Sequence, residues 1–125
     1  EGGYKIRFMV DRGFQKRHRL RSRSDFKHVY RHGRRFEFES FILFLKKTGD
    51  ETPRIGITTP KNLGTAVERN RLKRVVREAF RKHKETFTNY DVIAEPRVCA
   101  TSMTNSELTE GFLRGFKIAK AELEE

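Results

Sequence analysis

The chain has little of what disulfide scaffolds, membrane spans and secreted proteins require. Its 125 residues include one cysteine, three prolines and no tryptophan. Because a lone Cys99 cannot form an internal disulfide, the reducing cytoplasm is the expected compartment. The longest apolar run, residues 41–45, has the length of a strand and is too short to cross a membrane. The first residues also lack the apolar core and the cleavage site of a signal peptide.

The familiar patterns of protein catalysis are absent as well. The sequence contains no G-x-S-x-G nucleophile elbow, no H-E-x-x-H helix and no Cys/His set with zinc spacing. His28 and His32 have the one metal-like spacing, i,i+4, but without a third ligand an ordinary surface pair is favoured. A nuclease built on clustered carboxylates would need acids where this chain has arginines. We therefore expect no catalytic residue and no metal ligand in the polypeptide.

Positive charge is what the chain has in excess. Lys and Arg number 28 against 17 Asp and Glu, which gives a net charge of +11 and a pI near 10.2. This charge points to a nucleic acid or an anionic membrane as the partner. The length suits one domain with a modest core. We expect a flexible basic arm over residues 1–16, followed by one folded domain over residues 17–125.

Residues 65–84 are predicted to form the helix around which the chain is organised. Thr65 and Glu68 have the spacing of a capping box at its start. An apolar stripe at i, i+3, i+4, i+7 and i+8 is expected to face the core, while the opposite side is basic with few acids to neutralise it. This bias to one sign disfavours a merely solvated face. The stripe consists of Leu72, Val75, Val76, Ala79 and Phe80, and the basic face of Asn70, Lys73, Arg74, Arg77, Arg81 and Lys84.

The first half of the chain predicts a helix followed by three strands. Ser24 as N-cap and Gly33 in a left-handed position after the last turn bound a helix over residues 25–32. Residues 34–47 alternate and then run apolar, which predicts a short strand, a break near residue 39 and a strand buried on both faces. Residues 55–58 are expected to form a hairpin with that strand.

The second half predicts a βαβ crossover and a last helix. A strand over residues 90–94 follows the basic helix and should run parallel to the strand before it. Residues 97–103 are expected to be irregular. Thr104 and Glu107 then offer a capping box for an amphipathic helix, in which Gly111 and Gly115 permit a close approach. The sum is an α+β sandwich.

Two modes of nucleic-acid binding are open to this pattern. The basic helix could contact phosphates, each adding about −0.7 to −0.9 to the slope of log affinity against log salt. Phe26, Tyr30 and Phe44 could line a groove in which unpaired bases stack, at ~1–3 kcal/mol each. Core packing is the commoner fate of Phe, so the residues alone favour a core role for these rings.

The segment R-N-R-L-K-R-V-V-R-E-A-F-R, residues 69–81, closely resembles the signature helix of the bacterial ribonuclease P protein component. The resemblance extends over about residues 17–123 and is far longer than a three-residue motif. Arg19-Leu20, Ser24-Asp25-Phe26, Tyr30 and His32-Gly33 resemble the family's first helix, and residues 41–44, 54–57 and 91–93 resemble its strands.

This resemblance implies a fold, a function and partners. The fold would be a single-domain αβββαβα sandwich, with three helices, a four-stranded sheet and a left-handed βαβ crossover. The chain would be the small subunit of ribonuclease P, which removes the 5′ leader from precursor tRNA by magnesium-dependent phosphodiester hydrolysis. In that family the RNA holds the catalytic Mg²⁺, and the protein supplies no acid, base or nucleophile. The implied partners are the ribonuclease P RNA, bound one-to-one by a monomeric protein, and precursor tRNA, with no membrane.

The same resemblance implies two sets of site residues. The motif helix would face the catalytic RNA, and an aromatic cleft would receive the single-stranded leader. Phe44 stands where many relatives have tyrosine, and the loop around Lys61 departs from the family pattern. The RNA-facing set is Arg69, Asn70, Arg71, Lys73, Arg74, Arg77 and Arg81, and the leader-binding set is Phe26, Tyr30, Phe44 and Lys61.

A basic ribosomal or general RNA-binding protein is the main alternative, with the same helix lying on an A-form backbone. The aromatic cleft separates the two, because only leader binding requires it. A sequence-specific DNA binder would need more uncharged polar residues on the basic face than this chain has.

Overall fold

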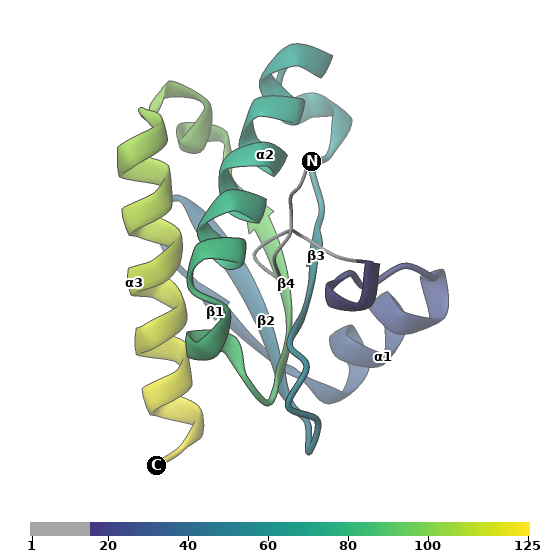
Figure 1. Cartoon of the computed structure of the whole chain (residues 1–125). Coiled ribbons are helices and arrows are strands. Elements are labelled where there is room, and N and C mark those ends of the chain that lie inside the picture. The colour runs from purple at the N-terminus through teal and green to yellow at the C-terminus, as the bar shows by residue number, and fades with distance from the viewer. Residues whose placement is uncertain (1–15) are drawn as a thin grey trace, which may run out of the picture.

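The computed structural model describes residues 16–125 of the chain (Figure 1). The arm expected over residues 1–16 therefore lies outside the described residues, except for Lys16. Within this range the elements follow in the order αβββαβα, with short 3₁₀ turns between them. Their bounds are α1 Arg23–His32, β1 Arg34–Glu37, β2 Phe41–Lys47, β3 Arg54–Ile57, α2 Ala66–Lys82, β4 Tyr90–Pro96 and α3 Asn105–Leu123. The turns are η1 Lys16–His18, η2 Lys61–Leu63, η3 Lys84–Phe87 and η4 Val98–Ser102.

The strands form one mixed sheet in the order β1-β2-β4-β3. β2 pairs antiparallel with β1 and β4, and β3 pairs parallel with β4, as predicted for the crossover. The predicted hairpin between β2 and β3 is wrong, because β4 lies between them. The reason is burial: Val92, Ile93 and Ala94 of β4 are fully enclosed, which suits a central strand covered on both faces.

Helices cover both faces of this sheet (Figure 1). α2 and α3 pack side by side on one face, and α1 lies on the other. The larger core lies under α2 and α3. A smaller core under α1 contains Leu20, Val29 and Ile93, with Phe26 and Phe44 packed against it. The α+β sandwich is therefore confirmed, and α1 rests on the less extensive of its two cores.

The crossover from β3 through α2 to β4 is left-handed. In Figure 1, β3 and β4 both run upward, α2 lies in front of the sheet, and β4 lies to the left of β3. This departs from the right-handed rule for parallel strands and agrees with the expectation from the family resemblance. It places α2 over the sheet with one side turned toward the edge strand β3.

Capping boxes begin all three helices of the described chain. The boxes predicted at residues 65–68 and 104–107 are present. The N-cap expected at Ser24 is wrong, because Ser22 is the N-cap. The hydroxyl of Ser22 accepts from the backbone N–H of Asp25, and the Asp25 carboxylate accepts from the backbone N–H of Ser22. The spacing S-x-x-D is the same motif placed two residues earlier, so α1 begins at Arg23.

Gly33, which ends α1, is not left-handed as expected. Its backbone is extended, with φ −88° and ψ −178°. A Cβ at this position would lie 2.6 Å from the carbonyl oxygen of Val29 and 2.8 Å from that of Leu45. Close passage of the chain between α1 and β2, rather than a positive φ, therefore requires glycine here. The predicted close approach at Gly115 is confirmed, since the ring of Phe38 lies 3.3 Å from where its Cβ would be.

Two further expectations need correction. β2 is not buried on both faces: Phe41, Leu43 and Leu45 are buried under α2 and α3, while Ile42 and Phe44 on the α1 face are only partly covered. The segment expected to be irregular contains the turn η4. The partial cover over β2 leaves room for a groove beside α1.

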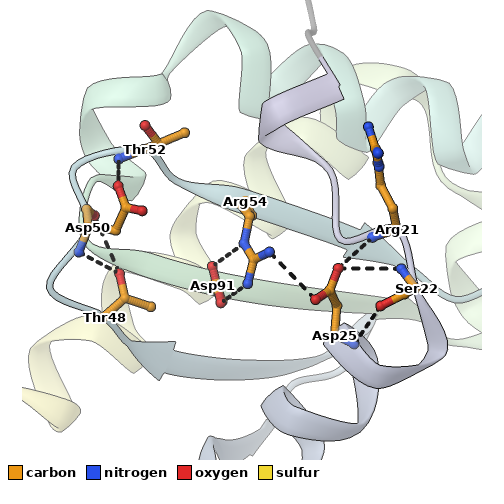
Figure 2. A network of polar contacts seen from close by, with 8 residues as sticks. All are labelled: Arg21, Ser22, Asp25, Thr48, Asp50, Thr52, Arg54 and Asp91. Atoms are coloured by element: carbon orange, nitrogen blue, oxygen red, sulfur yellow. Dashed lines mark hydrogen bonds and ion pairs between the residues drawn. The ribbon is translucent and has the colours of Figure 1, made fainter.

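Arg54 of β3 links α1 to the sheet (Figure 2). Its Nε and Nη2 donate to the two carboxylate oxygens of Asp91 on β4, at 3.1 and 2.8 Å. Its Nη1 lies 3.7 Å from Oδ1 of Asp25, the residue that caps α1. The hydrogen bond to Asp91 raises the pKa of Arg54. Hydrogen bonds from the backbone of Arg21 and Ser22, together with the Arg54 charge, lower the pKa of Asp25. We call these contacts of Arg54, Asp91 and Asp25 the Arg54 network.

Replacing Arg54 with methionine tests how much this network contributes to stability. Asp91 is only 3% exposed and would be left charged without its partner. Breaking a fully buried pair costs ~3–5 kcal/mol. Because 35% of the Arg54 side chain is exposed, we expect a smaller loss. Arg54→Met should lower the free energy of unfolding, measured by urea titration, by about 2–3 kcal/mol. R54M/D91N, which also removes the buried charge of Asp91 and leaves only the partly exposed Asp25 without its partner, should recover part of the loss. Equal stability of R54M and the wild type would contradict the assignment.

Candidate nucleic-acid interface

The outward side of α2 presents cations without carboxylate partners. Asn70, Arg74 and Arg77 are exposed and Lys73 is partly exposed. Among residues 16–125, neither Lys73, Arg74 nor Arg77 forms an ion pair with an acid. Partial desolvation of the Arg77 guanidinium, and then the positive charge of Arg19, lower the pKa of Arg77. A nearby anion would relieve that repulsion. We call Asn70, Lys73, Arg74 and Arg77 the α2 basic face.

Arg71, expected to face RNA, is used inside the protein. Its Nη2 donates to the carbonyl oxygens of Thr101 and Met103, at 3.2 and 3.1 Å, and its Nη1 donates to Oδ1 of Asn105, at 2.6 Å. These bonds tie α2 to η4 and to the first residue of α3. The structure therefore gives Arg71 a structural role, and RNA contact by this residue stays a prediction.

Arg69 and Arg81 are also engaged within the chain. Nη1 of Arg69 donates to the carbonyl oxygen of Gly64 at 2.9 Å, just before α2 begins. Arg81 forms a bidentate pair with Glu78, at 2.8 and 3.0 Å, and this hydrogen bonding raises the pKa of Arg81. Binding of RNA by either side chain would have to compete with these contacts. The seven predicted residues thus divide into four on the α2 basic face and three that hold internal partners.

The three predicted aromatic residues come together on the α1 face of the sheet. The rings of Tyr30 and Phe44 meet edge to face, with centroids 4.7 Å apart, and the ring of Phe26 lies 6.5 Å from that of Tyr30. Tyr30 is 41% exposed, and its hydroxyl lies 3.3 Å from Oγ1 of Thr58. Because Phe26 and Phe44 are only partly buried, the rings are accessible at one edge while they pack at the other. We call this group the aromatic cleft.

A cavity of about 160 Å³ joins the aromatic cleft to α2. Phe26 and Gly56 line it from α1 and β3, and Arg77 lines it from α2. The ring of Phe26 fits against Gly56, where a Cβ would lie only 2.5 Å from the ring atom Cζ. Arg77 of the α2 basic face and Phe26 of the cleft therefore border the same space, although α1 and α2 cover opposite faces of the sheet.

The other candidate residues lie apart from this junction. Lys61 is exposed in η2, directly after the loop that follows β3, and its carbonyl oxygen is 3.4 Å from Nη1 of Arg69. His28 and His32 are exposed neighbours on α1, with ring centroids 4.6 Å apart. No group of three or more His, Cys, Asp or Glu able to hold a metal ion occurs in the described part of the chain.

Comparison with known proteins identifies the family of this chain. The model of the family described as Ribonuclease P matches residues 14–120. The chain belongs to the ribonuclease P protein family. The ribonuclease P protein component of Macrococcus caseolyticus is 36% identical over 107 residues, which cover 85% of this chain and 93% of that protein. The corresponding protein of Thermotoga petrophila is 40% identical over 85 residues, or 67% and 73% of the two chains.

Solved structures of the family agree with the fold. The Staphylococcus aureus RNase P protein matches with a TM-score of 0.77 and 32% identity, over 82% of this chain and 95% of that one. The Thermotoga maritima RNase P protein matches with a TM-score of 0.71 and 32% identity, over 77% and 92%. The chain is thus an accessory protein subunit in the 5′ processing of tRNA, an endonucleolytic reaction, and its partner is a ribonuclease P RNA.

Sequence reasoning missed several residues that shape the interface. Arg54 and Asp91 stand opposite each other in the parallel pair of β3 and β4. The predicted parallel crossover could have suggested this pair, since the two side chains then share one face. Thr58 beside Tyr30, and Arg19 in the cavity with Arg77, gave no local signal, because their contacts span 28 and 58 residues. The described helices include none that is long and apolar enough to span a membrane.

Substitution of Arg71 and Arg74 separates the structural from the exposed cations. Arg71→Gln removes hydrogen bonds to two backbone carbonyls and should lower the free energy of unfolding by about 1–3 kcal/mol. Arg74→Gln, at an exposed position of the same helix, should change it by less than about 0.5 kcal/mol. Urea titration followed by circular dichroism measures both. Similar losses in the two variants would contradict this division.

Proposed function

We propose that the chain binds the ribonuclease P RNA through the α2 basic face and the single-stranded 5′ leader of precursor tRNA through the aromatic cleft. Lys61 would contact the leader from η2, apart from the cleft. Arg69, Arg71 and Arg81 would flank the RNA contact while keeping their internal partners. The observation that supports this most is the shared cavity lined by Phe26 and Arg77. It makes the stacking surface and the cationic surface continuous.

The two surfaces suit the two chemistries of RNA. Unpaired cations of one sign attract the phosphate backbone without regard to sequence. Partly exposed rings can stack on unpaired bases, as in other proteins that bind single strands. The cleft therefore favours leader binding over the alternative, in which the basic helix lies on an A-form backbone whose bases are already paired and cannot stack on the rings.

We further propose that the working particle contains one protein per RNA, acts in the cytoplasm and depends on Mg²⁺ bound mainly by the RNA. In the described residues, acidic and histidine side chains do not gather into a set of ligands for such an ion. The proposal therefore assigns no step of the hydrolysis to a metal ion bound by the protein. The polypeptide would contribute binding and orientation of the substrate, which raises the rate without an acid, base or nucleophile of its own.

The variant R74A/R77A tests the contact with the RNA subunit. Two phosphate contacts fewer should make the slope of log affinity against log salt less negative by about 1.4–1.8. Filter binding of the full chain to a bacterial ribonuclease P RNA over a range of KCl concentrations measures it. An unchanged slope would show that these side chains face solvent in the complex.

Substitution of Tyr30 tests leader binding. Tyr30→Ala should remove most of one stacking contact, ~1–3 kcal/mol, and so weaken binding of precursor tRNA by the reconstituted enzyme, with mature tRNA unaffected. Tyr30→Phe removes only the hydroxyl beside Thr58 and serves as the conservative control. Equal affinity of the wild-type enzyme for precursor and mature tRNA would instead favour the general RNA-binding alternative.

A further inference from the structure

A second groove lies on the sheet face that α1 covers, on the other side of α1 from the aromatic cleft. It is a basin of about 440 Å³. Lys46, Arg54 and Asp91 line it from the strands, Asp50 from the loop between β2 and β3, and His28 from α1. His28 also lines a groove of about 240 Å³ along α1, so the two spaces meet at this residue.

The carboxylates around the basin are already satisfied within the protein (Figure 2). Both oxygens of Asp91 accept from Arg54. Asp25 accepts from the backbone N–H groups of Arg21 and Ser22, just before α1, and faces the same guanidinium. Oδ1 of Asp50 accepts from the backbone N–H of Thr52 at 2.8 Å. These acids therefore hold the loop and α1 in place and are poorly placed to neutralise further cations.

Three cations beside the basin, Lys27, Arg31 and Lys46, have no such partners among the described residues. Lys27 and Arg31 are exposed one turn apart on α1, and Lys46 is partly exposed on β2. Among the residues that the structure describes, none of these three forms an ion pair with an acid. The rings of His28 and His32, 4.6 Å apart, add nitrogen donors between them. We call Lys27, His28, Arg31, His32 and Lys46 the α1 basic surface.

The chemistry of this surface fits a polynucleotide backbone better than a membrane. Like charges at i,i+4 destabilise a helix slightly, and a polyanion would relieve this. An interfacial membrane helix needs apolar side chains beside its cations. The side of α1 that carries Lys27 and Arg31 has none, since its apolar residues Phe26, Val29 and Tyr30 face the sheet and the cleft. Phosphates of an RNA strand require only the cations and donors that are present.

We propose that the α1 basic surface binds the phosphate backbone of an RNA segment other than the one in the aromatic cleft. This rests on the proposed function only in taking RNA as the partner. The segment belongs either to the ribonuclease P RNA or to the precursor tRNA, whose leader would pass over α1 after leaving the cleft. Both sources offer the same phosphodiester chemistry, and they differ in which binding measurement responds.

The test compares two pairs of charge removals on exposed helix faces. K27Q/R31Q removes two cations from α1. R114Q/K117Q removes two from the outer side of α3, where Arg114 forms only an exposed pair with Glu110. K46Q, on β2, probes the basin itself. For each full-length variant, salt-dependent affinity is measured for the ribonuclease P RNA, and, after reconstitution, for precursor tRNAs with a short and a long leader.

K27Q/R31Q should make the salt slope less negative by about 1.4–1.8 in one of these measurements, and K46Q by about half as much in the same one. A change with the RNA subunit alone assigns the segment to that RNA, and a change confined to the long leader assigns it to the substrate. The control R114Q/K117Q should leave both slopes unchanged. Urea unfolding verifies that each variant folds.

Three results would overturn the proposal. In the first, the salt slopes stay unchanged in every measurement. In the second, R114Q/K117Q makes the slopes less negative by as much as K27Q/R31Q does, which would indicate an effect of net charge alone. Binding to phosphatidylserine vesicles could also be lost in K27Q/R31Q while RNA binding is kept, which would identify a membrane contact. None of these outcomes bears on R74A/R77A, so failure of this inference is distinguishable from failure of the proposed function.

Discussion

The Arg54 network is the constraint on which the aromatic cleft depends. α1 supplies two rings of the cleft and β2 the third, yet the core beneath α1 contains three buried side chains, with Phe26 and Phe44 packed against them. Arg54 binds Asp91 within the sheet and Asp25 at the start of α1, so one guanidinium fixes the position of the helix relative to the strands. The buried carboxylate of Asp91 is the costly partner to leave unpaired, which fixes Arg54 on the sheet. The longer and partly exposed pair with Asp25 then adds a weaker link from Arg54 to α1, beside the apolar packing.

The same division of work appears on α2. Cations near its start and along its flank bind groups within the protein, as Arg71 binds the carbonyls of η4 and Arg69 that of Gly64. Among the residues that the structure describes, the cations on the outward side of α2 have no backbone carbonyl or carboxylate acceptor within hydrogen-bond distance. A single helix therefore carries arginines of two kinds, one set that fixes where the helix lies and another that the fold leaves for an anionic partner. Helical periodicity leaves Arg69 and Arg71 off the predicted basic face, and the family resemblance groups them with it. Periodicity does not separate Arg81, which lies on that face and is paired with Glu78.

Local signals were predicted well, and contacts between distant residues were not. The capping boxes at residues 65–68 and 104–107 and the apolar stripe of α2 depend on spacing within one helix, and all are present. The pairing of β2 depends on which strand is most buried, and β4 displaced the nearer β3. Ser24 and Ser22 both offer a cap, and only the second has an acid three residues on, at Asp25. The partners of Arg71 are backbone carbonyls about 30 residues away, which no sequence pattern marks.

The grouping of the aromatic residues follows from the topology of the sheet. β3 is an edge strand, and the crossover places α2 over one face and α1 under the other, so side chains from both helices reach the space beside Gly56. A larger residue there would push the Phe26 ring outward, because a Cβ would lie 2.5 Å from it. The depth of the Phe26 ring is therefore set by Gly56, a residue without a side chain. In the proposed complex with RNA, Gly56 would also set the distance between a stacked base and Arg77, so the backbone of this one edge strand would couple base stacking to phosphate contact.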